Sequence, residues 1–198
     1  MLKINHFYSL FIIIRNYLCF LKNYFTYKHW GFNSYVKLPM TVLNKQYIYI
    51  GNNVFINDRA RIEAIDEYKG IFYQPSIVIN NGVTIQQNLH LTSATRVEIG
   101  ENTAIVANVT ISDIIHPYTS EDIHLIDMPI ISKPVIIGKY CSIYNNVVVN
   151  AGVTIGDHVT IGANSVVTHD IPSYCIAVGS PARIIKKYDF NSKRWKKV

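Results

Sequence analysis

Three histidines are candidate chemical groups in this chain: His90, His116 and His124. An imidazole ring titrates near neutral pH, so it can take a proton from a hydroxyl group as a general base, or bind zinc through its neutral form. His116 has the most informative position, because the segment 112–117, SDIIHP, opens the longest interruption of an otherwise regular pattern. Reactive side chains are often found on loops that a rigid scaffold positions. His116 is therefore the first candidate for catalysis, and Asp113 is a candidate to orient its ring.

The regular pattern is a six-residue repeat of aliphatic side chains, and each of its interruptions follows a third repeat. A period of six fits neither an α-helix nor a plain strand ladder, but it is typical of a parallel β-helix whose stacked coils share one core. Three repeats make one triangular coil, so the pattern predicts about five coils over residues 48–172. The fifteen repeat positions are Ile50, Ile56, Ile62, Ile79, Ile85, Leu91, Ile99, Ile105, Ile111, Ile137, Ile143, Val149, Ile155, Ile161 and Val167.

Residues between the repeat positions support this interpretation. Three residues after the aliphatic position, nine repeats carry Asn, Gly or Asp, the types that adopt a positive φ angle at the lowest cost. One residue further on, the side chain is usually small or aliphatic, as a crowded interior requires. The nine predicted corner residues are Asn53, Gly82, Asn88, Asn102, Asn108, Asn146, Gly152, Asn164 and Asp170.

The interruptions of the repeat share one corner of the predicted coil. Eleven extra residues follow Ile62, two follow Leu91 and twenty follow Ile111. Since each interruption comes after a third repeat, we expect the insertions to lie along a single edge, with a protruding loop over residues 112–134.

Residues 1–47 precede the repeat, and the first thirty contain a helical pattern. Arg15 and Lys22 interrupt its apolar runs, so these are too short to span a bilayer, and no small-residue cleavage site marks a secretory signal. Two interpretations of residues 1–30 stay open: a helix packed on the β-helix or a neighbouring subunit, and a helix lying on an anionic membrane surface. The apolar positions are Phe7, Leu10, Phe11, Ile14, Leu18, Leu21 and Phe25.

Composition indicates one principal globular domain with flanking segments, at 198 residues of which 49% are hydrophobic. The three cysteines have no paired spacing, which favours a reducing compartment. The net charge of +6 is uneven: residues 1–57 contain no acid, and the predicted C-terminal tail, 173–198, is strongly basic. No nucleic-acid recognition motif accompanies this charge, so we expect no nucleic-acid partner.

The segment 135–187, VIIGKYCSIYNNVVVNAGVTIGDHVTIGANSVVTHDIPSYCIAVGSPARIIKK, resembles the C-terminal half of the maltose, galactoside and polysaccharide O-acetyltransferases. Its ending, AVGSPAR, is the most specific part. Over about two-thirds of its length the chain is similar to the hexapeptide-repeat acyltransferases. The resemblance implies an all-β fold, a left-handed parallel β-helix, which is an exception to the usual right-handed crossover. It also implies a homotrimer.

The same resemblance implies roles for individual residues. His116, in NVTISDIIHP, matches the general base of the family, and Asn88, in NLHLT, matches an asparagine that stabilises the tetrahedral intermediate. Acetyl-CoA is the implied co-substrate, bound in a groove between two subunits, with Arg183 as a partner of its phosphates. No metal is expected. The positions implied to contact the cofactor are Asn145, Ala163, Thr168, His169 and Arg183.

These observations predict an acetyl-CoA-dependent O-acetyltransferase for a bacterial surface saccharide, such as an O-antigen or capsule unit. We expect it in the cytoplasm, with a possible peripheral site on the inner membrane, and we expect the loops 63–78 and 117–134 to bind the acceptor. The alternative within the family is an acyltransferase for a small amino acid, amino sugar or antibiotic. Outside it, a zinc enzyme like the γ-class carbonic anhydrases and a non-catalytic scaffold stay open, although the histidine spacing does not match the zinc enzymes.

Overall fold

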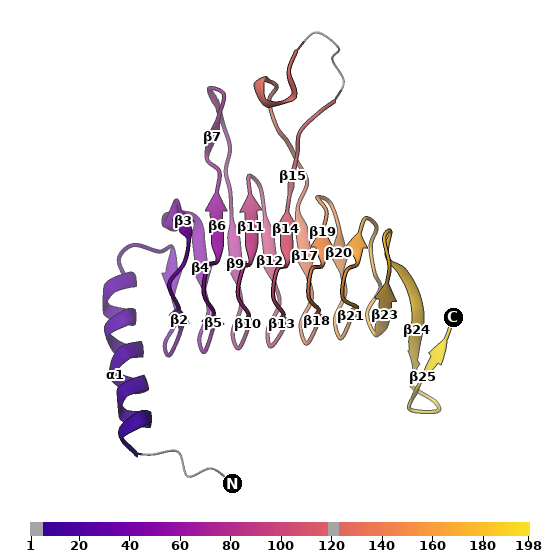
Figure 1. The fold of residues 1–198 in the computed structure, drawn as a ribbon, viewed down its shortest axis with the longest axis horizontal. Helices are drawn as coiled ribbons and strands as arrows, with labels where there is room; N and C mark the ends of the chain where they lie inside the picture. The colour runs from indigo at the N-terminus through magenta and orange to yellow at the C-terminus, as the bar shows by residue number, and fades with distance from the viewer. Residues whose placement is uncertain (1–5, 119–122) are drawn as a thin grey trace.

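The computed structural model describes residues 6–118 and 123–198, and the chain winds into a stack of triangular coils (Figure 1). Residues 1–5 and 119–122, which belong to the predicted N-terminal segment and the predicted loop, lie outside the described residues. Successive strands enter three sheets in turn, and neighbouring strands within the coils are parallel. The prediction of a mainly β protein built from parallel sheets is therefore confirmed.

Each sheet forms one side of the triangle. The first sheet contains β1 (His29–Trp30), β4 (Ile48–Ile50), β9 (Ile77–Ile79), β12 (Val97–Ile99), β17 (Val135–Ile137) and β20 (Thr154–Ile155). The second contains β2 (Tyr35–Val36), β5 (Phe55–Ile56), β10 (Thr84–Ile85), β13 (Ala104–Ile105), β18 (Ser142–Ile143), β21 (Thr160–Ile161) and β23 (Cys175–Val178), and it ends with the antiparallel strands β24 (Arg183–Asp189) and β25 (Arg194–Lys197). The third contains β3 (Thr41–Leu43), β6 (Arg61–Ala64), β11 (His90–Ser93), β14 (Thr110–Ser112), β19 (Val148–Val149) and β22 (Val166–Val167).

The core is the column of side chains that the repeat predicts. Strand register stacks one repeat position directly on the next, for example Ile79 on Ile99 and Ile99 on Ile137. All fifteen predicted repeat positions are at most 2% exposed. The small or aliphatic residues that follow the corners are also buried: Val54, Ala60, Val83, Thr103, Val109, Cys141, Val147, Val153, Val159 and Ser165.

The stack begins earlier in the chain than residue 48. Trp30, Val36 and Val42 pair with Ile50, Ile56 and Ile62, the repeat positions of the next coil. They keep the six-residue spacing, but the tryptophan at the first position breaks an exclusively aliphatic pattern. The three sheets therefore make six coils of three strands, one more than the five expected. A short 3₁₀ turn, η1 (Lys45–Tyr47), connects the first coil to the second.

Corner residues take the backbone conformation that their types predict. Of the nine predicted corners, all except Asp170 have φ between 55° and 82°. Of the other corner positions, Arg59 has a φ of 58°. Two aromatic residues, Tyr140 and His158, also have positive φ, at 57° and 55°. Their rings stack with centroids 4.9 Å apart, and His158 stacks on Tyr174 at 4.7 Å. We infer that this aromatic contact offsets the cost of a left-handed backbone at residues with a Cβ atom.

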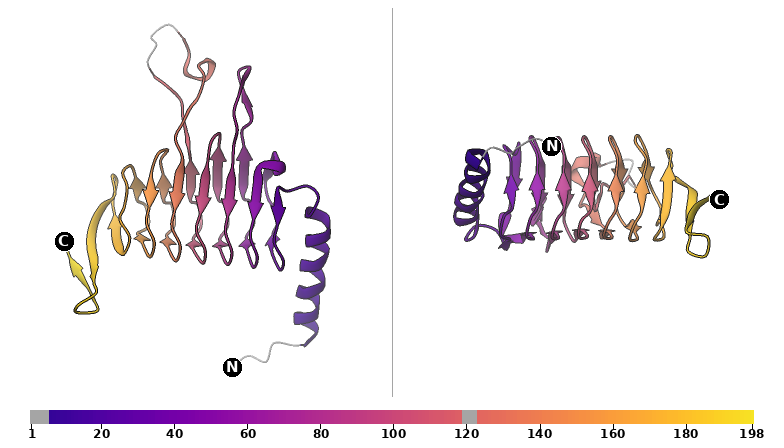
Figure 2. Two further views of the ribbon diagram at one scale, coloured as in Figure 1. Left: turned by 180° about the vertical axis from the view of Figure 1, so that it is seen from behind. Right: turned by 90° about the horizontal axis from the view of Figure 1, so that it is seen from below.

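Both long insertions leave the stack at the corner between the third and first sheets, as predicted. The first forms the hairpin β7 (Glu67–Tyr68) and β8 (Ile71–Phe72). The second forms the antiparallel pair β15 (Ile114–Ile115) and β16 (Ile131–Ser132), with a 3₁₀ turn, η2 (Leu125–Asp127), near its tip. Both rise from the same side of the stack (Figures 1 and 2).

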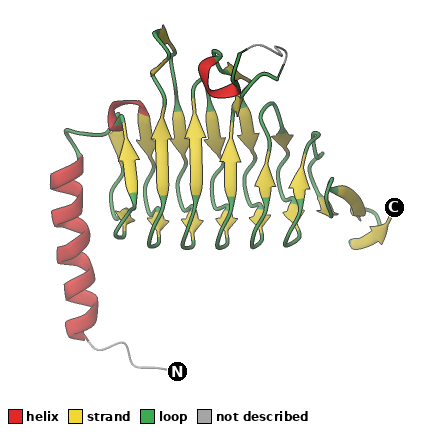
Figure 3. Cartoon of the chain, turned by 45° about the horizontal axis from the view of Figure 1, so that its top comes forward, coloured by secondary structure: helices red, strands yellow, loops and turns green. Residues whose placement is uncertain are grey.

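The predicted N-terminal helix is present as α1 (His6–Asn23). It lies at the N-terminal end of the stack, beside the first coil (Figures 1 and 3). In the part of the chain that the structure describes, no helix combines the length and apolar character that a bilayer crossing requires.

Asn108 tests the corner geometry, because its φ is 62° and its amide accepts from Asn88 and donates to Asn146. We expect Asn108→Ala to lower the free energy of unfolding more than Asn108→Gly, by about 1 kcal/mol, since glycine keeps the left-handed backbone without strain. Urea denaturation of both variants measures the difference. Equal stability, or a more stable alanine variant, would show that positive φ is not what selects asparagine here.

Candidate active site

His116 directly follows β15, where the second insertion leaves the stack, and its side chain is exposed. It borders a cavity of about 360 Å³ between the two insertions and the outer face of the third sheet. An exposed imidazole at the rim of a cavity of this size can meet a small polar molecule. The residues lining the cavity are Arg61, Ile65, Tyr68, His90, Thr92, Ser112, Ile114, His116 and Ile130.

The two insertions hold each other in place beside His116. The Tyr68 hydroxyl donates to the backbone oxygen of Ile126 at 2.7 Å, and Lys69 Nζ lies 2.7 Å from an Asp127 carboxylate oxygen. The ring of Tyr68 also meets the His116 ring edge-on, with centroids 5.8 Å apart. Sequence reasoning missed Tyr68. The available signal was that both insertions leave from one corner, which makes each the neighbour of the other.

Asp113 is completely buried, and it anchors the corner from which the second insertion starts. Its carboxylate oxygens accept hydrogen bonds from the Ser93 hydroxyl at 2.7 Å and from the backbone N–H groups of residues 94, 95 and 96 at 2.7–2.9 Å. Four donors offset much of the cost of burying a carboxylate. The expected contact with the His116 ring is therefore wrong: Asp113 instead holds the short turn between β11 and β12.

His90 lines the same cavity as His116. Burial lowers the pKa of its imidazole below the usual value, and the positive charge of Arg61 lowers the pKa further. Arg61 is itself paired with Glu63 at 2.8 Å. His90 is therefore neutral at neutral pH, so one ring nitrogen can accept a hydrogen bond from a hydroxyl group in the cavity.

His124 lies apart from this cavity, in the loop that precedes η2. Its Nδ1 atom accepts from the backbone N–H of Ile126 at 3.4 Å, so the ring caps that turn. Across residues 6–118 and 123–198, no three His, Cys, Asp or Glu side chains are grouped as a metal site.

Asn88 lies at the opposite end of the third sheet from His116, since it precedes β11, whereas His116 follows β14 and β15. Its amide donates to Asn108 at 2.7 Å and begins a ladder that continues through Asn146 to Asn164. Its positive φ and this ladder account for asparagine at the corner. Within one chain, Asn88 and His116 are therefore not brought together.

The five residues expected to contact a cofactor form two groups. Asn145 and Ala163 lie at the same corner as Asn88. There the backbone oxygen of Asn145 accepts a hydrogen bond from the backbone N–H of Asn164 at 2.9 Å. Thr168 and His169 follow β22, at its other end, and Arg183 begins β24, where its backbone pairs with Val178 at the end of β23. The Thr168 hydroxyl and His169 Nδ1 are 2.8 Å apart, and His169 and Arg183 line one cavity of about 350 Å³.

A further cavity connects the second group with the His116 region. It has a volume of about 380 Å³ and contains Thr168 and Asn150 at one end. At its other end it shares Ser112 and Ile114 with the cavity that His116 borders. One edge of the third sheet thus carries a row of three cavities, from Arg183 through Thr168 to His116.

Comparison with known proteins identifies the family of this chain. Residues 134–169 match the family described as bacterial transferase hexapeptide (six repeats). The chain is 38% identical over 162 residues to the galactoside O-acetyltransferase of Escherichia coli K12, covering 82% of this chain and 74% of that protein. It is 32% identical over 170 residues to WbbJ of the same organism, provisionally named a lipopolysaccharide biosynthesis O-acetyl transferase, covering 82% and 83% respectively.

A solved structure supports the fold independently. The hexapeptide-repeat acetyltransferase VCA0836 of Vibrio cholerae, complexed with acetyl-CoA, superimposes with a TM-score of 0.59 at 23% identity, over 91% of this chain and 83% of that one. The chain therefore belongs to the hexapeptide-repeat acetyltransferases, the family that its repeats and its C-terminal segment resemble.

Asp113 makes a testable contribution to the geometry of the site. Asp113→Ala leaves buried N–H groups without an acceptor, at about 1–3 kcal/mol each, so we expect at least about 3 kcal/mol of lost stability. His116→Ala is the matched control, since the exposed side chain should change stability by no more than about 0.5 kcal/mol. Thermal unfolding of both variants measures this. If the Asp113→Ala protein were as stable as the control, the anchoring role of Asp113 would be contradicted.

Proposed function

We propose that this protein is an O-acetyltransferase that transfers the acetyl group of acetyl-CoA to a hydroxyl group of a bacterial surface saccharide. The observation that carries the proposal is the position of His116, at the rim of a cavity that adjoins the row leading to Arg183. The galactoside O-acetyltransferase and WbbJ, by their names, support transfer to a sugar hydroxyl and a role in surface polysaccharide synthesis.

His116 acts as the general base in this proposal. Its imidazole removes the proton of the acceptor hydroxyl while the oxygen attacks the thioester carbonyl carbon. The carbonyl oxygen becomes an oxyanion in the tetrahedral intermediate. When the carbon–sulfur bond breaks, the imidazolium returns its proton to the departing sulfur, which leaves as the CoA thiol. The products are the acetyl ester and CoA, and the histidine regains its neutral form.

The row of cavities supports a path for acetyl-CoA along the edge of the third sheet. Arg183 and His169 would meet the nucleotide end, because a guanidinium group binds phosphate with a permanent charge and a planar set of donors. Thr168 would lie beside the pantetheine arm. The thioester would then reach the cavity that His116 borders, with Ser112 and Ile114 at the junction.

In this proposal a second subunit contributes Asn88, Asn145 and Ala163 to the site. They lie at the opposite corner of the third sheet from His116 and Thr168, so one chain cannot bring the two groups around one cofactor. A homotrimer of left-handed coils, packed side by side, would set the Asn88 corner of one subunit against the His116 edge of the next. The free amide N–H of Asn88 could then stabilise the oxyanion without bringing a titratable charge.

The acceptor would lie between the two insertions, against Tyr68, His90 and Arg61. Neutral imidazole and tyrosine suit the binding of sugar hydroxyls, since they offer hydrogen bonds without a net charge. We place this reaction in the cytoplasm, where acetyl-CoA is available.

His116 and His124 form a matched pair for testing the role of the base, because both are exposed histidines of one loop and only His116 borders the cavity. We expect His116→Ala to lower turnover by about 10²–10⁴-fold, as for loss of a general base, and His124→Ala to keep most of it. Release of CoA thiol in the presence of an acceptor saccharide measures turnover. Near-normal turnover in His116→Ala would refute the assignment.

A further inference from the structure

Helix α1 presents buried polar side chains to the protein, which is unusual for a helix on a water-exposed surface. Its protein-facing side contains the buried amide side chains of Asn16 and Asn23. Asn16 donates to Asn33 Oδ1 at 2.6 Å and accepts from Arg15 at 2.8 Å, while the guanidinium of Arg15 lies 3.8 Å from the centroid of the Tyr35 ring. These polar groups lie beside Cys19 and Phe20, which pack against the core, so α1 presents a mixed polar and apolar side to the first coil, where an ordinary amphipathic helix presents its apolar face.

The outward side of α1 and the turn that follows is apolar instead. Nine large hydrophobic side chains of this segment are between 48% and 88% exposed. They recur at the three- and four-residue spacing of a single helical face. Contiguous apolar surface of this kind marks a site that another molecule or a membrane covers. The side chains are Leu10, Phe11, Ile13, Ile14, Tyr17, Leu18, Leu21, Tyr24 and Phe25.

Charge at this end of the molecule has a single sign. No Asp or Glu occurs before Asp58, whereas Lys22 and Lys28 are exposed beside the apolar face. Lys37 is neutralised by Asp58 at 2.7 Å. The remaining cations have no acid from residues 1–57 to pair with, so this surface is complementary to an anionic one.

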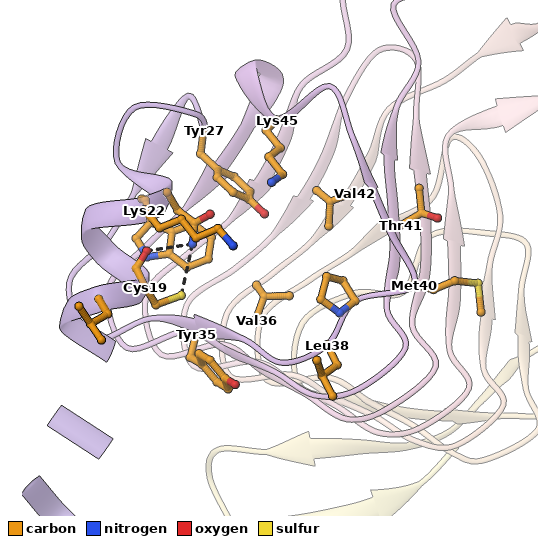
Figure 4. A pocket seen from close by; sticks show the side chains of 14 residues that line it. Cys19, Lys22, Tyr27, Tyr35, Val36, Leu38, Met40, Thr41, Val42 and Lys45 are labelled. Carbon is orange, nitrogen blue, oxygen red and sulfur yellow. Dashed lines mark hydrogen bonds between the residues drawn. The ribbon is translucent and has the colours of Figure 1, made fainter. Parts of the chain in front are cut away.

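A cavity of about 520 Å³ opens between α1 and the first coil, next to this surface. Figure 4 shows apolar side chains of the first coil, among them Val36, Val42 and Met40, and the amino groups of Lys22 and Lys45 beside them. Apolar walls with ammonium groups close by match the two parts of a phospholipid: an acyl chain and a phosphate headgroup.

We propose that α1 docks this protein on the surface of an anionic phospholipid membrane, with the helix lying in the interface and its outward face among the upper acyl chains. Tyr17 and Tyr24 suit this depth, since an amphipathic ring prefers the headgroup region. The same segment of a second copy is a poorer occupant of this face, because residues 1–57 contain no acid to meet its cations.

Flotation of the full-length protein with vesicles tests the proposal. We expect binding to vesicles of phosphatidylcholine mixed with phosphatidylglycerol, little binding to phosphatidylcholine alone, and weaker binding as salt concentration rises. A variant with Phe11→Gln, Leu18→Gln and Phe25→Gln should have a partition coefficient at least about tenfold lower, because each of the three side chains contributes buried apolar area. Glutamine keeps the helix propensity high.

Phe72→Gln is the matched control, since Phe72 is an 84% exposed aromatic on the β7–β8 hairpin, away from α1. It should bind vesicles like the unmodified protein. Light scattering on all three proteins reads the oligomeric state, which the triple variant should keep. The proposal fails if the unmodified protein does not float with anionic vesicles, or if the triple variant floats equally well. Loss of the oligomer in the triple variant, without vesicle binding by the unmodified protein, would assign the face to a contact between copies.

Discussion

Every part of this molecule depends on one packing constraint: an aliphatic side chain must land on its counterpart in the next coil at each side of the triangle. Ile79, Ile99 and Ile137 illustrate this, since they stack in register although 20 and 38 residues separate the successive pairs. An insertion within a side would shift the interior residues out of the core, so extra residues are tolerated only at corners. In this chain the two long insertions share the corner between the third and first sheets, and the cavity that His116 borders lies between them as a consequence.

Asp113 fixes the position at which the second insertion leaves the stack. A carboxylate this deep in a protein is costly unless donors satisfy it, and the turn after β11 supplies three backbone N–H groups and a hydroxyl. The same residue lies between β14 and β15, three positions before His116. The base of the second insertion is thus tied to the adjacent coil, while Tyr68 and Lys69 restrain its outer part.

The sequence was most informative where the physics is local or periodic. Six-residue spacing predicted which side chains are buried, and the preference of asparagine and glycine for positive φ predicted the corners. The first coil was missed because Trp30 fills a position that the pattern reserved for aliphatic residues. Tyr140 and His158 were missed as left-handed corners, because the stacking that stabilises them joins residues from different coils. Asp113 and Tyr68 depend on contacts between separate segments, which no spacing along the chain displays.

In the proposed reaction, acetyl-CoA provides an acetyl group that becomes an ester on a saccharide. The most direct measurement uses acetyl-CoA labelled in its acetyl group, an isolated bacterial surface saccharide as the acceptor, and mild alkali treatment of the product. We expect label to enter the saccharide and alkali to release it, because acetyl esters hydrolyse under these conditions whereas amides do not. Label that resists alkali would indicate an amino acceptor instead. Absence of label from the saccharide would contradict the proposed acceptor class.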